Sequence, residues 1–370
     1  MNNSYAWCAT FALVALAHAS QAQILVGQTA GFSGPVSAGV QETTAGAMLY
    51  IDAVNAKGGI KGKKIELVSL DDKFDPKLAG ENARHLIEDR QVLALFLTRG
   101  TPHTQAILPF LNKYGVPLIG PSTGAMVLHQ PVQTHVFNVR ATYQREAEKA
   151  IGQLTSMGFT RIGLVYADDS FGADGVEGAQ KGFAAGKLSA TFLEKFDRSK
   201  PDFGSIAAKV LQSKAQAIMM VASGQAVVDA VKAFRAVGST AQIVTLSNNA
   251  SSGFIKSLGD EAPGVIVTQV FPYERSVGYA LVTQAQELAK AKGLGEISPA
   301  MLEGFAAAKV LVEALRKAGA KPTRSSIQTA LEGMRKFDIG GLEISYSTTD
   351  HTGLDFSDLS IISANGKFKR

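Results

Sequence analysis

The chain has 370 residues, of which 46% are hydrophobic and 19% are charged, a globular composition that excludes a largely disordered chain. The net charge of +5 is small for this length and the Lys and Arg residues are scattered, so no nucleic-acid partner is predicted. The length is too great for one ordinary hydrophobic core and suits two α/β lobes.

The N-terminal segment predicts export. Residues 1–22 contain no Lys, Arg, Asp or Glu, and the stretch from Trp7 to Ala17 is almost wholly apolar, although too short to span a bilayer. Ser20 and Ala22 are small residues at the −3 and −1 positions of a cleavage site before Gln23. A cleaved signal peptide over residues 1–22 is favoured over a buried N-terminal helix, although basic residues are missing before the apolar run. We therefore expect a periplasmic protein.

Several kinds of chemistry have no sequence signature. The only cysteine, Cys8, lies in the leader, so no disulfide, thiolate metal site or cysteine nucleophile is predicted. No glycine-rich phosphate loop or serine nucleophile elbow is present, and the six histidines lack metal-ligand spacing. We therefore expect no catalysis, no cofactor and no metal.

After the leader, short apolar runs alternate with amphipathic segments of helical length. The predicted strands are Ile24–Gln28, Lys64–Leu70, Val92–Thr98, Val116–Gly120, Arg161–Tyr166, Ala217–Ala222, Gln242–Leu246 and Val265–Val270. The predicted helices include Thr44–Ala56, Pro76–Asp89, Gln144–Met157, Gln225–Val237 and Pro299–Ala318. Strands that are continuously hydrophobic are buried on both faces, which predicts parallel sheets covered by helices and an α/β, doubly wound fold.

Two loops of the N-terminal half are candidates for binding a carboxylate. Thr101 and Pro102 follow the strand that ends at Leu97 and are predicted as the N-cap and first position of a helix, where free N–H groups bind anions. The second loop follows Ile119 and holds three small residues, Ser122, Thr123 and Gly124, which allow the backbone to approach an anion closely. Each loop alone is also explained as a plain cap or turn. Because they follow neighbouring parallel strands, we expect them side by side, which favours a carboxylate site.

The C-terminal half offers residues that could close the same cleft. Phe171 opens a predicted helix and either covers the ligand or belongs to the core, while Ser247 and Asn248 end another strand with polar side chains. Arg140 and Tyr143 lie where the strand–helix series breaks, so hinge and ligand contacts would coincide there. An ion pair is the alternative role for Arg140.

Several motifs together resemble a known family. They are Ser33–Pro35, the run Asp52–Gly62, the pair Asp71–Asp72 followed by Asp75–Pro76, Thr104–Gln105 and Gly120–Ser122. From Gln23 to the C-terminus, the chain resembles the type I periplasmic solute-binding proteins of the Leu/Ile/Val-binding family. The resemblance implies two Rossmann-like lobes joined by three crossovers, with a ligand cleft between them. We place the first lobe at residues 23–141 plus 269–345 and the second at residues 142–268 plus 346–370.

The resemblance also implies roles for individual residues. Thr101 matches the hydroxyl that binds the ligand carboxylate, and Ser122 matches a position whose backbone contacts an amino-acid ligand. Gly124 stands where a second carboxylate-binding Thr is usual, and Ser247 stands where an acidic residue pairs the ligand ammonium. Tyrosines of the family pocket align with Gly39, Phe171 and Ser223, and its half-cystines with Phe74 and Gly100. A buried ammonium without a counter-charge is unfavourable, so these departures weaken the expectation of an α-amino acid.

The expected function is therefore the substrate-binding component of an ABC importer of the branched-chain amino acid type. Its ligand would be a small carboxylate-bearing solute, either a branched-chain amino acid or a related aliphatic or aromatic acid, held by lobe closure. The expected partners are a membrane permease and an ATPase, and the chain itself is expected to be a monomer. The alternatives are a ligand-sensing module of the same fold feeding a separate receptor or regulator, and an α/β enzyme.

Overall fold

The structure is a computed structural model that describes residues 23–370, so the predicted signal peptide lies outside the described residues. The first of two lobes is built on a five-stranded parallel sheet in the order β2-β1-β3-β4-β5. Its strands are β1 (Ile24–Ala30), β2 (Ile65–Asp71), β3 (Ala94–Phe96), β4 (Leu118–Ile119) and β5 (Val136–Phe137). Its helices are α1 (Ser37–Ala56), α2 (Pro76–Glu88), α3 (Thr101–Tyr114), α9 (Ala280–Ala291), α10 (Pro299–Lys317) and α11 (Arg324–Glu332). A small ribbon of β11 (Phe337–Asp338) and β12 (Glu343–Ile344) completes it.

The second lobe holds a seven-stranded sheet in the order β14-β13-β10-β9-β8-β6-β7, in which β13 runs antiparallel to both of its neighbours, β10 and β14. Its strands are β6 (Ile162–Ala167), β7 (Leu193–Phe196), β8 (Ala217–Val221), β9 (Gln242–Thr245), β10 (Ile266–Gln269), β13 (Asp358–Ile362) and β14 (Phe368–Lys369). Its helices are α4 (Tyr143–Ser156), α5 (Ser170–Ala185), α6 (Phe203–Ser213), α7 (Gln225–Ala236) and α8 (Ser252–Leu258). A short 3-10 turn, Ser247–Asn249, follows β9.

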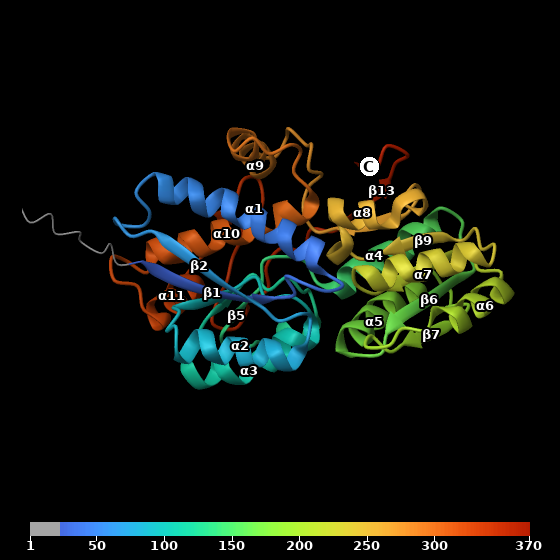
Figure 1. The fold of residues 1–370 in the computed structure, drawn as a ribbon, viewed down its shortest axis with the longest axis horizontal. Coiled ribbons are helices and arrows are strands. Elements are labelled where there is room, and N and C mark those ends of the chain that lie inside the picture. The colour runs from blue at the N-terminus through green and yellow to red at the C-terminus, as the bar shows by residue number, and fades with distance from the viewer. Residues whose placement is uncertain (1–22) are drawn as a thin grey trace, which may run out of the picture.

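The chain passes between the lobes three times within the described residues: from β5 to α4, from β10 to α9 and from β12 to β13 (Figure 1). Gln269 pairs with Asp358 in the second sheet, whereas Tyr346 and Leu354 pack in the hydrophobic core of the first lobe. The third passage therefore lies between Leu354 and Asp358, later than the boundary placed at residues 345 and 346.

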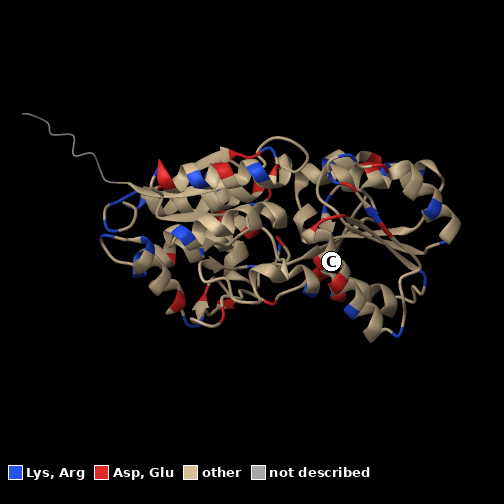
Figure 2. Cartoon of the chain, turned by 90° about the horizontal axis from the view of Figure 1, so that it is seen from below, with Lys and Arg blue, Asp and Glu red and all other residues tan. Residues whose placement is uncertain are grey.

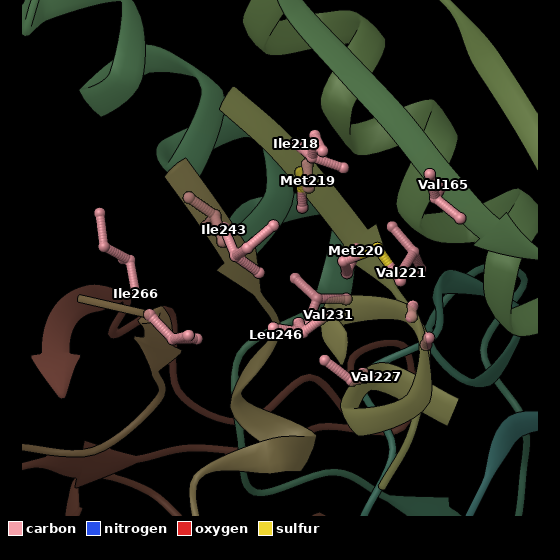
Figure 3. Packing of buried hydrophobic residues seen from close by; sticks show 14 of the residues in the cluster. Val165, Ile218, Met219, Met220, Val221, Val227, Val231, Ile243, Leu246 and Ile266 are labelled. Atoms are coloured by element: carbon pink, nitrogen blue, oxygen red, sulfur yellow. The ribbon is translucent and has the colours of Figure 1, made fainter. Parts of the chain in front are cut away.

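Burial on both faces explains the continuous apolar runs. Every residue of β8 is buried, and side chains from β6, β9, β10 and α7 pack around it (Figure 3). The labelled side chains of this core are Val165, Ile218, Met219, Met220, Val221, Val227, Val231, Ile243, Leu246 and Ile266. Each such side chain contributes about 1.5–3 kcal/mol by its removal from water, so the sheet needs helices on both sides.

Helices α1 and α10 pack together along the first lobe although about 250 residues of sequence separate them (Figure 1). Their backbones approach closely at Gly304, where an added Cβ would lie 1.7 Å from the carbonyl oxygen of Thr43. The first lobe therefore depends on a helix from the C-terminal part of the chain.

Two strands of the first lobe are shorter than predicted. Strand β3 ends at Phe96 and strand β4 at Ile119, and the residues that follow them, Leu97 and Gly120, have positive φ angles of 49° and 58°. A left-handed residue turns the backbone out of the ladder, which a hydrophobicity pattern does not reveal. Strand β5 was not predicted because it is only two residues long, and β7 was missed because it is an edge strand with mainly exposed or half-buried residues.

Lys and Arg residues are interspersed with Asp and Glu over both lobes (Figure 2). Within residues 23–370, no helix combines the length and apolar character needed to cross a membrane, and no group of three or more His, Cys, Asp or Glu side chains could hold a metal ion.

Candidate ligand-binding cleft

A cavity of about 370 Å³ lies between the two lobes. The first lobe contributes residues 34–39, at the start of α1, together with Arg99. The second lobe contributes the start of α7, from Gly224 to Val228, and the segment from Asn248 to Ser257. The volume is in the range of small-molecule sites, and a ligand here would touch both lobes.

Arg99 is the one charged side chain that lines this cavity among the described residues. It follows the end of β3 and is only 5% exposed. Its Nη1 donates to Ser122 Oγ at 2.9 Å, and its Nη2 donates across the cleft to the carbonyl oxygen of Asn248 at 2.5 Å. Within residues 23–370 no carboxylate lies within 4.0 Å of its guanidinium. A guanidinium has five N–H donors, so these two hydrogen bonds leave donors without a protein partner. Burial lowers the pKa of Arg99 from its ordinary value, but an arginine stays charged.

Arg140 is also buried but, unlike Arg99, lies beside two carboxylates. Its Nη2 pairs with Glu146 and also donates to Ser247 Oγ at 2.6 Å, while its Nη1 lies 3.7 Å from Glu303. Burial alone would lower the pKa of Arg140, but the carboxylates of Glu146 and Glu303 raise it. Arg140 does not line the cavity, so its role is the structural ion pair that the sequence left as the alternative.

Glu146, on α4, connects this helix to β10 and to the turn that follows β9. Its carboxylate accepts from the backbone N–H of Ser247 at 2.9 Å and from the hydroxyl of Thr268. The negative charge nearest Ser247 is therefore Glu146, and Arg140 already neutralises it.

Direct contacts hold the two lobes together beside the cavity. The carboxylate of Glu42, on α1, accepts from the backbone N–H groups of Ser252 and Gly253, at the start of α8, at 3.0 and 2.8 Å. The carbonyl oxygen of Pro35 accepts from the N–H of Gln225, the first residue of α7, at 3.0 Å. Figure 1 shows α8 beside the end of α1 that faces the second lobe. The lobes are therefore closed on one another.

The two loops predicted for carboxylate binding lie side by side. Arg99 and Ser122 pair as a parallel bridge, and the hydroxyl oxygens of Thr101 and Thr123 are 2.8 Å apart. Both threonines are buried and outside the cavity lining. Ser122 reaches the cavity through its hydrogen bond to Arg99.

The remaining predicted residues form a buried layer that continues to the crossover. The N–H of Tyr143 donates to the carbonyl oxygen of Gly124 at 2.8 Å, and the Tyr143 ring packs edge-on against Phe171 at 4.9 Å between centroids. Phe171 belongs to the hydrophobic core of the second lobe, and Ser247 is held by Arg140 and Glu146. Of the eight predicted ligand-binding residues, Asn248 alone lines the cavity.

The predicted cap of α3 was wrong by one residue. Gly100 is the N-cap, with φ 91°, and the helix begins at Thr101, whose side chain caps nothing. A side chain at position 100 would clash with His103, since a Cβ added to Gly100 would lie 2.6 Å from His103 Nδ1. Only glycine combines this positive φ with so close an approach.

Comparisons with known proteins agree with this architecture. A family model for periplasmic binding proteins matches residues 23–360. The chain belongs to the periplasmic binding protein family.

Individual members of the family are distant in sequence. The chain is 24% identical to the Leu/Ile/Val-binding protein of Escherichia coli strain K12 over 269 residues, which cover 71% of this chain and 72% of that protein. A substrate-binding periplasmic protein from Ralstonia solanacearum is 31% identical, with a TM-score of 0.86 over 94% of this chain and 99% of that one. A branched-chain amino acid ABC transporter protein from Thermus thermophilus with bound valine is 18% identical, with a TM-score of 0.82 over 94% of this chain and 95% of that one. The predicted fold class and family are confirmed.

This periplasmic binding protein has cavity residues that the sequence reasoning missed. Residues 35–38 and the start of α7, Gly224 and Gln225, carry no charge or catalytic signature that would single them out. Arg99 had a signal, because an arginine that directly follows a buried strand is held at the carboxyl edge of its sheet. Gly39 lies beside it, and an added Cβ there would be in ordinary van der Waals contact, 3.7 Å from Arg99 Nη2.

Proposed function

We propose that this periplasmic binding protein is the substrate-binding component of an ABC importer of the branched-chain amino acid type. It binds a small carboxylate-bearing solute between its lobes and delivers it, in the periplasm, to a membrane permease and its ATPase. The observation that carries the proposal is the interlobe cavity with Arg99 in its wall. The names of its relatives support the class of function, since they bind leucine, isoleucine and valine.

Lobe closure is the mechanism that the contacts support. A ligand that touches Arg99 and residues 34–39 on one side and Gln225 and Asn248 on the other stabilises the closed form over the open form. In this proposal the contacts of Glu42 and Pro35 with the other lobe also stabilise the closed form. Under the same mechanism, Ser122 and Asn248 hold Arg99 toward the solute. A second layer of residues packs outside the cavity lining and positions these contacts: Thr101, Thr123, Gly124, Tyr143, Phe171 and Ser247. The transporter would recognise the closed pair of lobes, each molecule acting as a monomer.

Thermal unfolding of the purified, ligand-stripped protein against a panel of solutes tests this proposal. The panel holds branched-chain and aromatic amino acids, their deaminated acids, short amides and benzoate-type acids. A ligand present at a hundredfold over its dissociation constant stabilises by about 2.7 kcal/mol, which raises the melting temperature by several degrees. Small-angle scattering should then show a smaller radius of gyration with the solute that binds, and deletion of the gene should remove uptake of that solute by the cells. Turnover of the bound solute, or uptake unaffected by the deletion, would refute the importer role.

A further inference from the structure

The donors of Arg99 that the protein leaves free define what the cavity can bind. Its two protein contacts, Ser122 Oγ and the carbonyl oxygen of Asn248, are both uncharged. A carboxylate or phosphate is the natural partner of a guanidinium, which it meets with two parallel hydrogen bonds. A cation held 95% buried between two lobes is therefore a receptor for an anionic group of the ligand.

Among residues 23–370, none of the side chains that line the cavity is an Asp or Glu. Glu42 accepts from Ser252 and Gly253, Glu146 is paired with Arg140, and Glu303 also lies beside Arg140. An α-ammonium group in the cavity would thus be buried near the cation of Arg99 without a counter-charge, which is unfavourable.

The rest of the cavity wall is mixed and includes an apolar part. Pro35, Val36, Val228 and Phe254 contribute hydrophobic side chains, and the polar side chains are those of Ser37, Gln225, Ser251 and Ser257 besides the two asparagines. The amides of Asn248 and Asn249 already donate within the second lobe. Asn248 Nδ2 donates to Ala222 O and Ser223 Oγ, and Asn249 Nδ2 donates to Ala222 O and Thr245 Oγ1. Asn249 Oδ1 likewise accepts from the N–H of Gly224 at 2.7 Å. These two amides therefore have little hydrogen-bonding capacity left for a ligand, and the hydrophobic part of the wall suits an apolar ligand body.

We infer that the solute is a monocarboxylate with an apolar body and no ammonium group, and that Arg99 binds its carboxylate. This inference rests on the proposed function, because it names the substrate class of the same cleft. Arg99 is then the residue that sets specificity, in place of the acidic side chain missing at Ser247.

Isothermal titration calorimetry with matched pairs of compounds tests this inference. The pairs are 4-methylpentanoate with leucine and 3-phenylpropanoate with phenylalanine, in which the members differ only by the ammonium group, and 4-methylpentanamide is the uncharged analogue. At least one acid should bind at least tenfold more tightly than its amino acid, and the amide at least tenfold more weakly than the acid. Arg99→Gln should lower the affinity for the acid at least tenfold, and Arg99→Lys by less. Arg84→Gln, which removes an exposed arginine of α2, is the control and should bind like the wild type.

The outcomes separate this inference from the proposed function. If leucine or phenylalanine binds as tightly as its deaminated acid, or if Arg99→Gln keeps its affinity for the acid, the inference is overturned while the importer role stands. If only the amide or another uncharged solute binds, the inference is likewise overturned while the importer role stands. The comparison of the pairs on the wild type decides the question even if Arg99→Gln does not fold. If no solute of the wider panel binds, both the inference and the proposed function fail.

Discussion

The two buried arginines between the lobes occupy opposite situations. At the crossovers, Arg140 has carboxylates from Glu146 and Glu303 and the hydroxyl of Ser247 around it. At the cavity, Arg99 has only a serine hydroxyl and a backbone carbonyl. A buried charge that a nearby opposite charge neutralises has a structural role. A buried charge that lines a cavity and keeps free hydrogen-bond donors indicates a ligand-binding role. The two sites therefore require opposite results from mutation.

The largest effect is expected at the crossovers. Glu146→Gln should lower the free energy of unfolding by about 3–5 kcal/mol, because it leaves the Arg140 cation buried with one distant partner. Urea denaturation monitored by circular dichroism measures this loss. Glu148→Gln is the matched control, since it removes a half-buried carboxylate of the same helix that forms no ion pair among residues 23–370; its effect should stay within about 0.5 kcal/mol. A loss below about 1 kcal/mol for Glu146→Gln would show that the pair is not a structural unit.

Glu274 extends the comparison to a buried carboxyl group that has no ion-pair partner within residues 23–370 and does not line the interlobe cavity. It is 5% exposed, its neighbour Arg275 pairs with Glu296 instead, and burial raises the pKa of Glu274 to about 7 from an ordinary value of 4.5. Below pH 4.5 the carboxyl is protonated in both states. Between pH 4.5 and 7 the stability falls, because the unfolded chain releases a proton that the folded protein retains, and above pH 7 the loss levels off. Glu274→Gln should therefore become more stable than the wild type by about 3 kcal/mol between pH 4.5 and pH 8.

Urea titrations at several pH values measure this difference. Glu287→Gln, at an exposed position of α9, is the control and should show a difference that does not change with pH. A flat difference for Glu274→Gln would mean that its carboxylate is solvated or paired in solution.

The face of the cleft that closes can be tested without touching either arginine. An added Cβ at Gly253 would lie 2.5 Å from Cβ of Ala38 in the other lobe. Gly253→Ala should lower ligand affinity about tenfold, because overpacking of about 1–3 kcal/mol arises only in the closed form. Calorimetry with the solute that binds measures this effect. Gly152→Ala is the matched control: it lies in α4 with open space around it, and it should bind normally. Equal affinity for both variants would show that α1 and α8 do not approach on closure.

The smallest effect, and the most diagnostic in sign, is expected at the cavity. Arg99→Met should raise the free energy of unfolding of the ligand-free protein by about 1 kcal/mol while it removes binding, because an unpaired buried cation does not stabilise the fold. Denaturation in urea without ligand measures it, with Arg84→Met as the exposed control. A loss of more than about 1 kcal/mol would place Arg99 with Arg140 as a structural residue.

The sequence was sufficient for the fold because burial on both faces leaves continuous apolar runs such as the one in β8, and because several family motifs appear in order. It also located the loops at the carboxyl ends of β3 and β4. It did not identify the cavity, because Gln225 and residues 34–39 become neighbours only through the angle between the lobes. That angle depends on many weak contacts far apart in sequence.

The sequence was similarly limited for individual side chains. It left Arg140 between an ion pair and a ligand contact, since Glu303 lies 163 positions further along the chain and only the fold brings it close. It could not show that the hydroxyls of Thr101 and Thr123 satisfy one another. Local pattern therefore predicts which elements exist, while partner choice at the cleft is a property of the assembled lobes.

The packing of α10 against α1 has a consequence for how the protein is made. The core of the first lobe includes residues of α9, α10 and α11, which leave the ribosome after the whole of β6 to β10. The first lobe cannot bury its α1 surface until those helices arrive, whereas five parallel strands of the second lobe lie in one uninterrupted stretch. The first lobe is thus completed only after those five strands have been synthesised, and until α10 follows them α1 lacks the helix that covers its apolar face.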